Sequence, residues 1–153
     1  MTVGIQPSLE KTAIRTRPFL KWAGGKSQLL PDLLPLIPAH FDKYIEPFVG
    51  AGALYFAQNH RNSIISDSNE ELIVTYEAVR DDVEGVIKAL GRFSHDKESF
   101  YQIRSLDTSK LGDLEHAARL IYLNKTCFNG LYRVNQKGEF NTPCNGAIIS
   151  TPN

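Results

Sequence analysis

The hydrophobic positions of the chain change their spacing twice, and each change marks a different kind of element. Two short apolar runs, at 44–49 and 63–66, are typical of buried strands, and a helix is expected between them at 51–59. From 69 to 123 the apolar residues recur every three or four positions, which predicts a block of helices. Beyond Asn124 the spacing changes to two runs that are expected to pair with each other.

Aspartate and asparagine residues occur in the helical block where helix caps are expected. A side-chain oxygen at such a position accepts the backbone N–H groups that the first helical turn leaves free. Gly91 lies just past the second helix, where glycine is common. The four helices are expected at 69–80, from Asp81 or Asp82 to Leu90, from Asp96 to Leu106 and from Asp113 to Leu123.

The last predicted element is a hairpin. Its runs, 131–135 and 139–142, are joined by Gln136-Lys137-Gly138, in which Gly138 supplies a positive φ. A strand–helix–strand unit followed by helices and a hairpin predicts an α/β fold whose core carries an inserted module. The length suits one domain, and the 42% apolar content is that of a globular protein.

The composition indicates the cellular compartment of the protein and argues against a metal site. No apolar run approaches the roughly 20 residues of a membrane helix, and residues 1–17, without an apolar core, are interpreted as a basic flexible leader. Cys127 and Cys144 form no CxxC pair, which suits a reducing cytoplasm. The four histidines are scattered without ligand spacing, so no metal site is expected.

Charge is balanced overall and uneven along the chain, with seventeen basic against seventeen acidic residues. Residues 1–30 hold five basic and one acidic side chain, residues 31–118 hold eight and fifteen, and residues 119–153 hold four and one. Binding to phosphates needs positive surface, so the neutral total argues against a nucleic-acid partner. The two basic segments, however, leave a nucleic-acid partner possible.

Two glycine-containing segments invite comparison with phosphate-binding motifs. Gly25-Lys26-Ser27 matches the end of G-x-x-x-x-G-K-[ST], but the first glycine of that motif would fall at Leu20. Phe48-Val49-Gly50-Ala51-Gly52 lies between a strand and a helix, where glycines let the backbone approach a ligand closely. The third glycine of the dinucleotide fingerprint would fall at Tyr55, so an adenosine-type ligand without a pyrophosphate is favoured.

Three further side chains are candidates for a ligand pocket. Asp67 ends the second strand, 17 residues after Gly50, where an acid can accept both hydroxyls of a ribose. The alternative is a tight turn followed by a capping aspartate. Trp22 and Lys26, beside two glycines, either line a small polar site or provide packing and a solvated charge.

Residues 124–135 interleave aromatic side chains, amides and two cations. Arginine reads guanine through two hydrogen bonds in the major groove, and apolar loop residues can wedge into a base stack. An ordinary hairpin packed on the core is the alternative, and composition does not separate the two.

Together these segments resemble the Dam-type (class D12) DNA adenine methyltransferases, which methylate the exocyclic amine of adenine with S-adenosylmethionine. The matching strings, in family order, are PFLKWAGGK (18–26), EPFVGAGA (46–53), ISDSN (65–69) and LNKTCFNGLYRVNQKGEFNTP (123–143). The resemblance implies a Rossmann-like S-adenosylmethionine-dependent methyltransferase core, incomplete in this chain, with an inserted target-recognition module of helices and a hairpin.

The resemblance also implies roles for individual residues. S-adenosylmethionine would be enclosed and bound by Trp22, Lys26, Phe48, Gly50, Gly52 and Asp67. DNA would be contacted by Phe128, Asn129 and Leu131, which match positions that press on or between base pairs, and by Arg133, which matches a guanine-reading arginine. GATC is the commonest target of relatives with this hairpin.

The chain departs from the family pattern at the catalytic motif. The family activates the adenine amine with a [DNS]-P-P-[YFW] tetrad downstream of the hairpin, and this sequence contains no Pro-Pro pair. No catalytic residue is therefore assigned. Residues 144–149 also lack the cations that usually follow the hairpin. The expected partners are double-stranded DNA and, for the missing catalytic half, a second polypeptide, with no membrane involved.

The resemblance divides the chain into four parts: a leader at 1–17, the cofactor-binding part of the core at 18–68, the target-recognition module at 69–145 and a truncated return to the core at 146–153. Three hypotheses remain open at this stage. The chain is the N-terminal part of an adenine methyltransferase, a binding module for DNA or S-adenosylmethionine without turnover, or a truncated gene product without function.

Overall fold

The computed structural model describes residues 16–146. Most of the expected leader at 1–17 and of the expected return to the core at 146–153 lies outside the described residues. The elements, in chain order, are η1 (Lys26–Leu29), α1 (Leu30–Leu33), η2 (Leu34–Leu36), β1 (Tyr44–Glu46), α2 (Ala53–Gln58), β2 (Ser63–Ile65), α3 (Glu70–Asp81), α4 (Val83–Leu90), α5 (Lys97–Arg104), η3 (Thr108–Lys110), α6 (Asp113–Thr126) and η4 (Phe128–Gly130).

The expected strand–helix–strand unit is present, but the expectation that both strands are buried was wrong. Ile45 and Ile64 are 61% and 50% exposed, because within the described residues the two strands pair only with each other. β1 and β2 pair in parallel, with Tyr44 opposite Ser63 and Glu46 opposite Ile65, and α2 connects them. Parallel pairing places the carboxyl ends of both strands at one edge, where the glycine turn and the segment after β2 also lie. A mixed fold of helices and a small parallel sheet is therefore confirmed.

The helical block also follows the sequence pattern. The side chains of Asn69, Asp82 and Asp96 accept backbone N–H groups from the third residue beyond them, so all three act as caps. Two boundaries were wrong. α5 ends at Arg104, which leaves Leu106 outside the helix and 41% exposed. α6 continues to Thr126 because its last turn packs in the core.

The hairpin is less regular than expected. Among the described residues its two runs share one antiparallel bridge, between Val134 and Phe140, instead of two continuous strands. The Asn135 side chain accepts the N–H groups of Lys137 and Glu139, which replaces ladder bonds near the turn. Gly138 has the expected positive φ of 80°.

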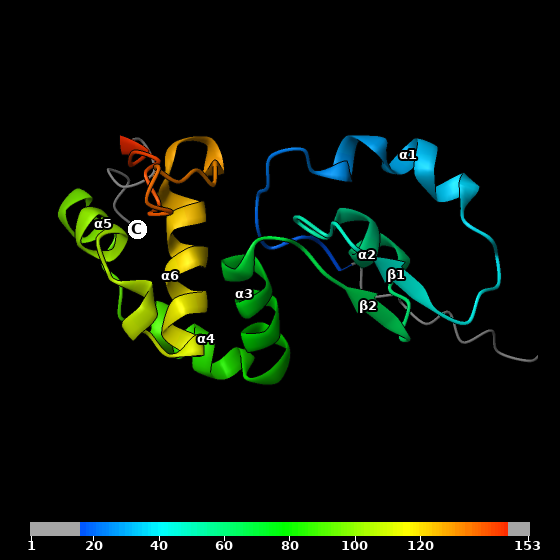
Figure 1. Ribbon diagram of the computed structural model, residues 1–153, viewed down its shortest axis with the longest axis horizontal. Helices are drawn as coiled ribbons and strands as arrows, with labels where there is room; N and C mark the ends of the chain where they lie inside the picture. The colour runs from blue at the N-terminus through cyan, green and yellow to red at the C-terminus, as the bar shows by residue number, and fades with distance from the viewer. Residues whose placement is uncertain (1–15, 147–153) are drawn as a thin grey trace, which may run out of the picture.

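The elements form two groups that meet at α3 (Figure 1). The sheet, α1 and α2 lie in one group, and α4, α5, α6 and the hairpin lie in the other, with the segment before α1 running between them. A sheet-side core cluster comprises Leu20, Val49, Leu72, Tyr76 and Leu120. A hairpin-side core cluster comprises Phe100, Ile103, Tyr122, Leu123, Cys127 and Phe140.

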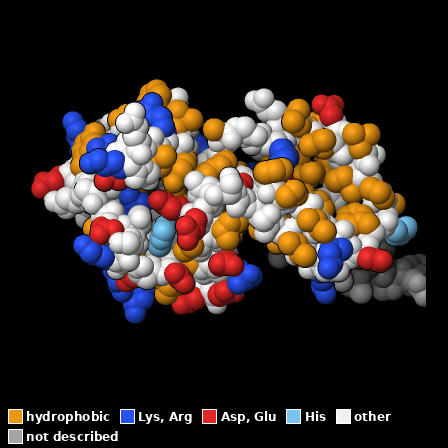
Figure 2. Space-filling view, viewed as in Figure 1, with side chains coloured by type: hydrophobic (Ala, Val, Ile, Leu, Met, Phe, Trp, Pro, Cys, Tyr) orange, Lys and Arg blue, Asp and Glu red, His pale blue; other side chains and the backbone are white. Residues whose placement is uncertain are grey.

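The surface of the two groups differs in character. Figure 2 shows hydrophobic side chains gathered over the sheet and α1, and charged side chains concentrated over the helical group. The exposed apolar residues of the sheet group include Leu36, Ile45, Phe48 and Ile64. Within the described residues, no helix has the length and apolar character needed to cross a membrane.

Candidate functional site

The glycine turn after β1 has a backbone that only glycine adopts easily. Gly50 and Gly52 have φ values of 50° and 71°. A Cβ on Gly50 would lie 3.2 Å from the Trp22 indole, and one on Gly52 would lie 3.0 Å from the Phe56 ring. The Tyr76 hydroxyl donates to the Gly50 carbonyl at 2.8 Å, which holds the turn from below. Larger residues at either glycine would displace this loop.

Asp67 lies directly beside the glycine turn. Its Oδ2 atom accepts the Gly50 N–H at 2.9 Å, and its Oδ1 atom accepts the Asn69 N–H at 3.1 Å. A carboxylate offers about four acceptor positions, so two remain for another donor. Asp67 thus joins the end of β2 to the turn after β1 and keeps capacity for a hydroxylated ligand.

Lys26 contacts the same turn from the N-terminal segment. Its Nζ atom donates to the Phe48 carbonyl at 2.6 Å and lies 3.0 Å from the Glu46 carboxylate. The Tyr44 hydroxyl donates to that carboxylate at 2.7 Å, and burial, followed by the hydrogen bond to Glu46, raises the pKa of Tyr44. The cation therefore orients a loop carbonyl and neutralises a buried acid.

Sequence reasoning missed Glu46. It is 5% exposed in β1, and its partners come from a neighbouring strand position and from Lys26. The sequence did contain one indication of its role, the acid itself, because a carboxylate inside a short apolar strand requires a partner.

Trp22 lies between the glycine turn and the hairpin. One part of its ring approaches Gly50, and its plane stacks on Tyr132 with centroids 4.8 Å apart and an interplanar angle of 24°. Tyr132 was not among the residues expected to act at the site. Its contact with Trp22 depends on the tertiary arrangement, and no spacing in the sequence indicates it.

A buried amide makes a second connection between the N-terminal segment that carries Trp22 and the hairpin region. Asn124, at 1% exposure, accepts the Lys21 N–H at 2.8 Å and donates to the carbonyls of Lys21 and Gly130, at 2.8 and 3.1 Å. Gly130 has a φ of 66°, and a Cβ there would lie 2.5 Å from the Lys21 side chain. We call Lys21, Asn124 and Gly130 the amide clasp.

The four DNA-binding candidates occupy the outer surface beyond this clasp. Phe128 is 52% exposed and Leu131 is 41% exposed, both large apolar side chains on a protruding turn. Asn129 has a left-handed φ of 55° and is exposed. Arg133 is also exposed, and its Nε atom donates to the Asn141 side chain at 3.0 Å, which orients the guanidinium.

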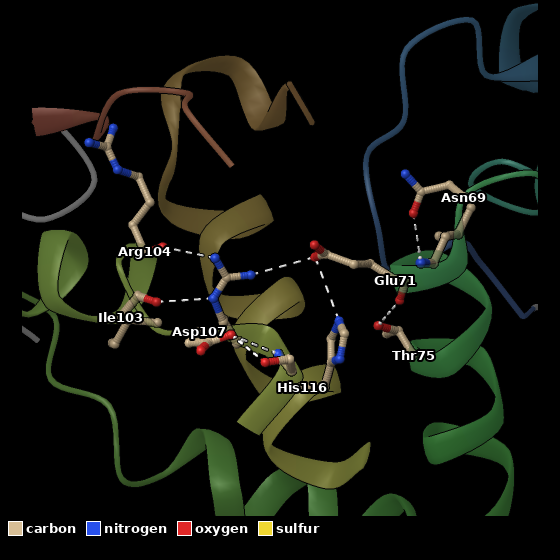
Figure 3. A network of polar contacts seen from close by, with 10 residues as sticks. Asn69, Glu71, Thr75, Ile103, Arg104, Asp107 and His116 are labelled. Atoms are coloured by element: carbon tan, nitrogen blue, oxygen red, sulfur yellow. Dashed lines mark hydrogen bonds and ion pairs between the residues drawn. The ribbon is translucent and has the colours of Figure 1, made fainter. Parts of the chain in front are cut away.

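A buried arginine ties the helices that support the hairpin. Arg119 donates to the carbonyls of Ile103 and Arg104, at 3.1 and 2.8 Å, and lies 3.5 Å from the Glu71 carboxylate. Figure 3 shows Glu71 extending from α3 toward His116, which lies 3.7 Å away. Burial lowers the pKa of Arg119, and the Glu71 charge opposes that shift. This network lines one wall of a cavity of about 630 Å³ beneath the hairpin.

The structure therefore brings most of the cofactor-binding candidates together. Direct contacts connect Lys26 with Phe48, Trp22 with Gly50, and Gly50 with Asp67. Gly52 completes the turn, and its Cβ position faces Phe56 and Tyr76. The DNA-binding candidates form a separate, exposed group linked to the first by the amide clasp and the Trp22–Tyr132 stack.

This arrangement coincides with a family match. Residues 22–146 match the model of the D12 class N6 adenine-specific DNA methyltransferase family, and the chain belongs to this family. The family relationship explains why a glycine turn, an acid after the second strand and a helix-supported hairpin occur together.

Curated relatives agree with the family match. The chain is 42% identical over 141 residues to the type II methyltransferase M1.LlaDCHI of Lactococcus lactis subsp. cremoris, a match that covers 88% of this chain and 50% of the relative. It is 40% identical over 151 residues to the type II methyltransferase M.MjaIII of Methanocaldococcus jannaschii, covering 85% and 52%. It is 37% identical over 138 residues to the DNA adenine methylase of Haemophilus influenzae, covering 87% and 48%. The chain thus spans about half the length of these relatives.

Proposed function

We propose that this chain supplies the cofactor-binding and target-recognition parts of a site-specific DNA-methyltransferase that methylates N6 of adenine in duplex DNA. Residues 18–68 form the cofactor part of a Rossmann-like core, and residues 69–145 form the inserted recognition module. The observation that supports this most directly is the contact of Gly50 with both Asp67 and Trp22. Three segments of the family pattern, 18–26, 46–53 and 65–69, therefore meet at Gly50.

The residues of the turn suit S-adenosylmethionine. Gly50 and Gly52 carry no Cβ, so the backbone of the turn is open to close approach by a ligand. The carboxylate of Asp67 retains acceptor positions for ribose hydroxyls. Trp22 and Phe48 offer aromatic surface, and Lys26 holds the Phe48 carbonyl in place. The cofactor supplies an activated methyl group on sulfur, and the role of these residues is to bind and orient it.

Removing the Asp67 carboxylate tests the cofactor assignment. We expect Asp67→Ala to weaken S-adenosylmethionine binding at least about tenfold, because a hydrogen bond to a charged group contributes roughly 1.5–3 kcal/mol. Isothermal titration calorimetry on the 153-residue chain measures the change.

The matched control is Asp42→Ala, which removes an exposed carboxylate before β1. Its affinity should equal that of the parent, and thermal melts should show both variants folded. If the parent binds and Asp67→Ala binds equally well, the ribose assignment is wrong. If the parent itself does not bind, the cofactor function of this chain is refuted.

The hairpin is assigned to DNA on the exposure and chemistry of its four candidates. Phe128 and Leu131 present apolar surface that suits insertion at a base step, and Arg133 presents a guanidinium held by Asn141. Asn129, in its left-handed turn, lies between the two apolar residues in the sequence. The proposed partner of this module is double-stranded DNA, and the proposed location is the cytoplasm.

Truncating Arg133 tests whether this residue reads a base. We expect Arg133→Ala to weaken binding to a duplex containing GATC by about 1–3 kcal/mol and binding to a scrambled duplex by much less. Fluorescence anisotropy at fixed salt measures both affinities. Lys137→Ala, on the turn of the same hairpin, serves as the matched cation control and should reduce both affinities similarly. Equal losses on both duplexes for Arg133→Ala would show a phosphate contact.

Methyl transfer itself is proposed to require a tetrad that this sequence does not contain. A second polypeptide, or further chain, would supply it and cover the apolar side of the sheet. Within the described residues β1 and β2 pair only with each other, and an apolar cavity of about 530 Å³ opens beside β2, α2 and α3. Transfer of a labelled methyl group to DNA by this chain alone would contradict the proposal.

A further inference from the structure

At the start of the hairpin, from Leu131 to Arg133, successive side chains alternate between the outside and the inside of the molecule. Leu131 and Arg133 are exposed, whereas Tyr132 between them points inward and is only partly accessible. This alternation is the ordinary consequence of extended backbone, in which successive side chains face opposite sides. The two residues assigned to DNA therefore flank a side chain that faces the cofactor part.

Tyr132 is shared by both core clusters. It packs against the hairpin-side cluster, where its ring meets Phe140 edge-on at 5.7 Å, and against the sheet-side cluster, where it stacks on Trp22 at 4.8 Å. Trp22 in turn lies against Gly50, whose N–H is bound by Asp67. A continuous set of contacts thus runs from the hairpin to the acid of the glycine turn.

Tyr132 also adjoins α3, because the sheet-side cluster against which it packs contains Leu72 and Tyr76 of that helix. Burial raises the pKa of Tyr132, and the side chains of Asn69 and Glu71 act on its hydroxyl. Asn69 caps α3 and donates its own N–H to Asp67. The ring of Tyr132 therefore stacks on Trp22, which approaches Gly50, and packs against residues of α3.

We infer that Tyr132 is a positioning residue that couples occupancy of the cofactor site to the placement of the DNA-reading hairpin. The coupling rests on the proposed function and adds a physical link between its cofactor-binding and DNA-binding parts. A ligand that fixes the glycine turn and Trp22 also fixes the ring of Tyr132, and with it Leu131 and Arg133. By reciprocity, DNA that fixes the hairpin favours the cofactor-bound arrangement of Trp22 to the same degree.

The molecule carries its own reporter for this coupling, because Trp22 is the single tryptophan of the sequence. Two measurements are made on the 153-residue chain: the Trp22 emission on addition of a short GATC duplex, and the calorimetric affinity for S-adenosylmethionine with and without that duplex. We expect DNA to change the emission and to tighten cofactor binding about fivefold or more.

Two variants separate the stack from the hydroxyl. The affinity ratio is the cofactor affinity with DNA divided by the cofactor affinity without it. Tyr132→Leu should bring this ratio close to one. It should change the cofactor affinity without DNA by less than about threefold, which is below a typical allosteric coupling. Tyr132→Phe keeps the ring and should keep most of the ratio. Tyr101→Leu, a substitution of an exposed tyrosine on α5, is the matched control and should behave as the parent.

The outcomes are distinct for the coupling and for the proposed function. A ratio that survives in Tyr132→Leu, or a parent in which DNA binds without altering either readout, overturns the coupling and leaves the proposed function standing. If Tyr132→Leu does not fold, the parent and Tyr132→Phe still decide through the emission change and the ratio. A parent that binds neither ligand overturns the proposed function and the coupling with it.

Discussion

Replacing Asn124 with leucine is expected to lower the free energy of unfolding by roughly 3–5 kcal/mol. Leucine keeps the number and branching of the side-chain heavy atoms and removes all three hydrogen bonds of the amide clasp. The part-buried N–H and carbonyl of Lys21 and the buried carbonyl of Gly130 then lose their side-chain partner. A buried polar group left unpaired costs about 1–3 kcal/mol. Chemical denaturation of the parent and the variant measures the difference.

The matched control is Asn62→Leu, since Asn62 is exposed and its amide makes one bond, to the Asp42 carbonyl at 2.8 Å. It should cost about 1 kcal/mol or less. Hydrogen exchange at the Lys21 amide adds a local readout, because protection there depends on the Asn124 oxygen. A loss for Asn124→Leu no larger than that of the control would contradict the structural importance of the clasp.

Replacing Arg119 with leucine is expected to cost about 3–5 kcal/mol, because breaking a buried ion pair leaves its partner without compensation. Arg119 is 2% exposed, and its guanidinium donates to the carbonyls that end α5, at Ile103 and Arg104. The variant leaves those carbonyls without their donor and Glu71 without its nearest cation. Thermal and urea unfolding should both report the loss.

Arg92→Leu is the matched control for the buried arginine. Arg92 and Glu115 form an exposed pair at 3.8 Å, and exposed pairs contribute about 0–1 kcal/mol. The double variant with Glu71→Gln should recover part of the stability lost in Arg119→Leu, since it removes the uncompensated carboxylate. Equal stability of the two arginine variants would show that the network at α3, α5 and α6 carries little energy.

Local sequence signals predicted the helices and strands well. The caps at Asn69, Asp82 and Asp96 form where aspartate or asparagine precedes a helical pattern, and each is satisfied within its own turn. Likewise, β1 and β2 follow their apolar runs. These features depend on neighbours three or four residues away, so the sequence contains the information directly.

The contacts that assemble the site could not be predicted in this way. Glu46 pairs with Lys26, Asn124 with Lys21, and Tyr132 with Trp22. Each of these partners lies on another segment, and nothing in the local sequence identifies it. The hairpin failed as a pair of regular strands because the Asn135 side chain competes for the N–H groups next to the turn. Motif resemblance supplied the candidate residues, and tertiary packing supplied the connections among them.

The amide clasp also has a consequence for the order in which the protein forms during its synthesis. Lys21 and Asn124 are 103 positions apart, so the N-terminal segment cannot adopt its final hydrogen bonds until the chain has grown past Gly130. At about 5–20 residues per second, the ribosome takes on the order of ten seconds to add that length. During this interval Trp22 and the glycine turn lack their hairpin contacts, and a nascent chain is open to chaperones and proteases. The contacts between the glycine-turn side and the hairpin are therefore completed together and late.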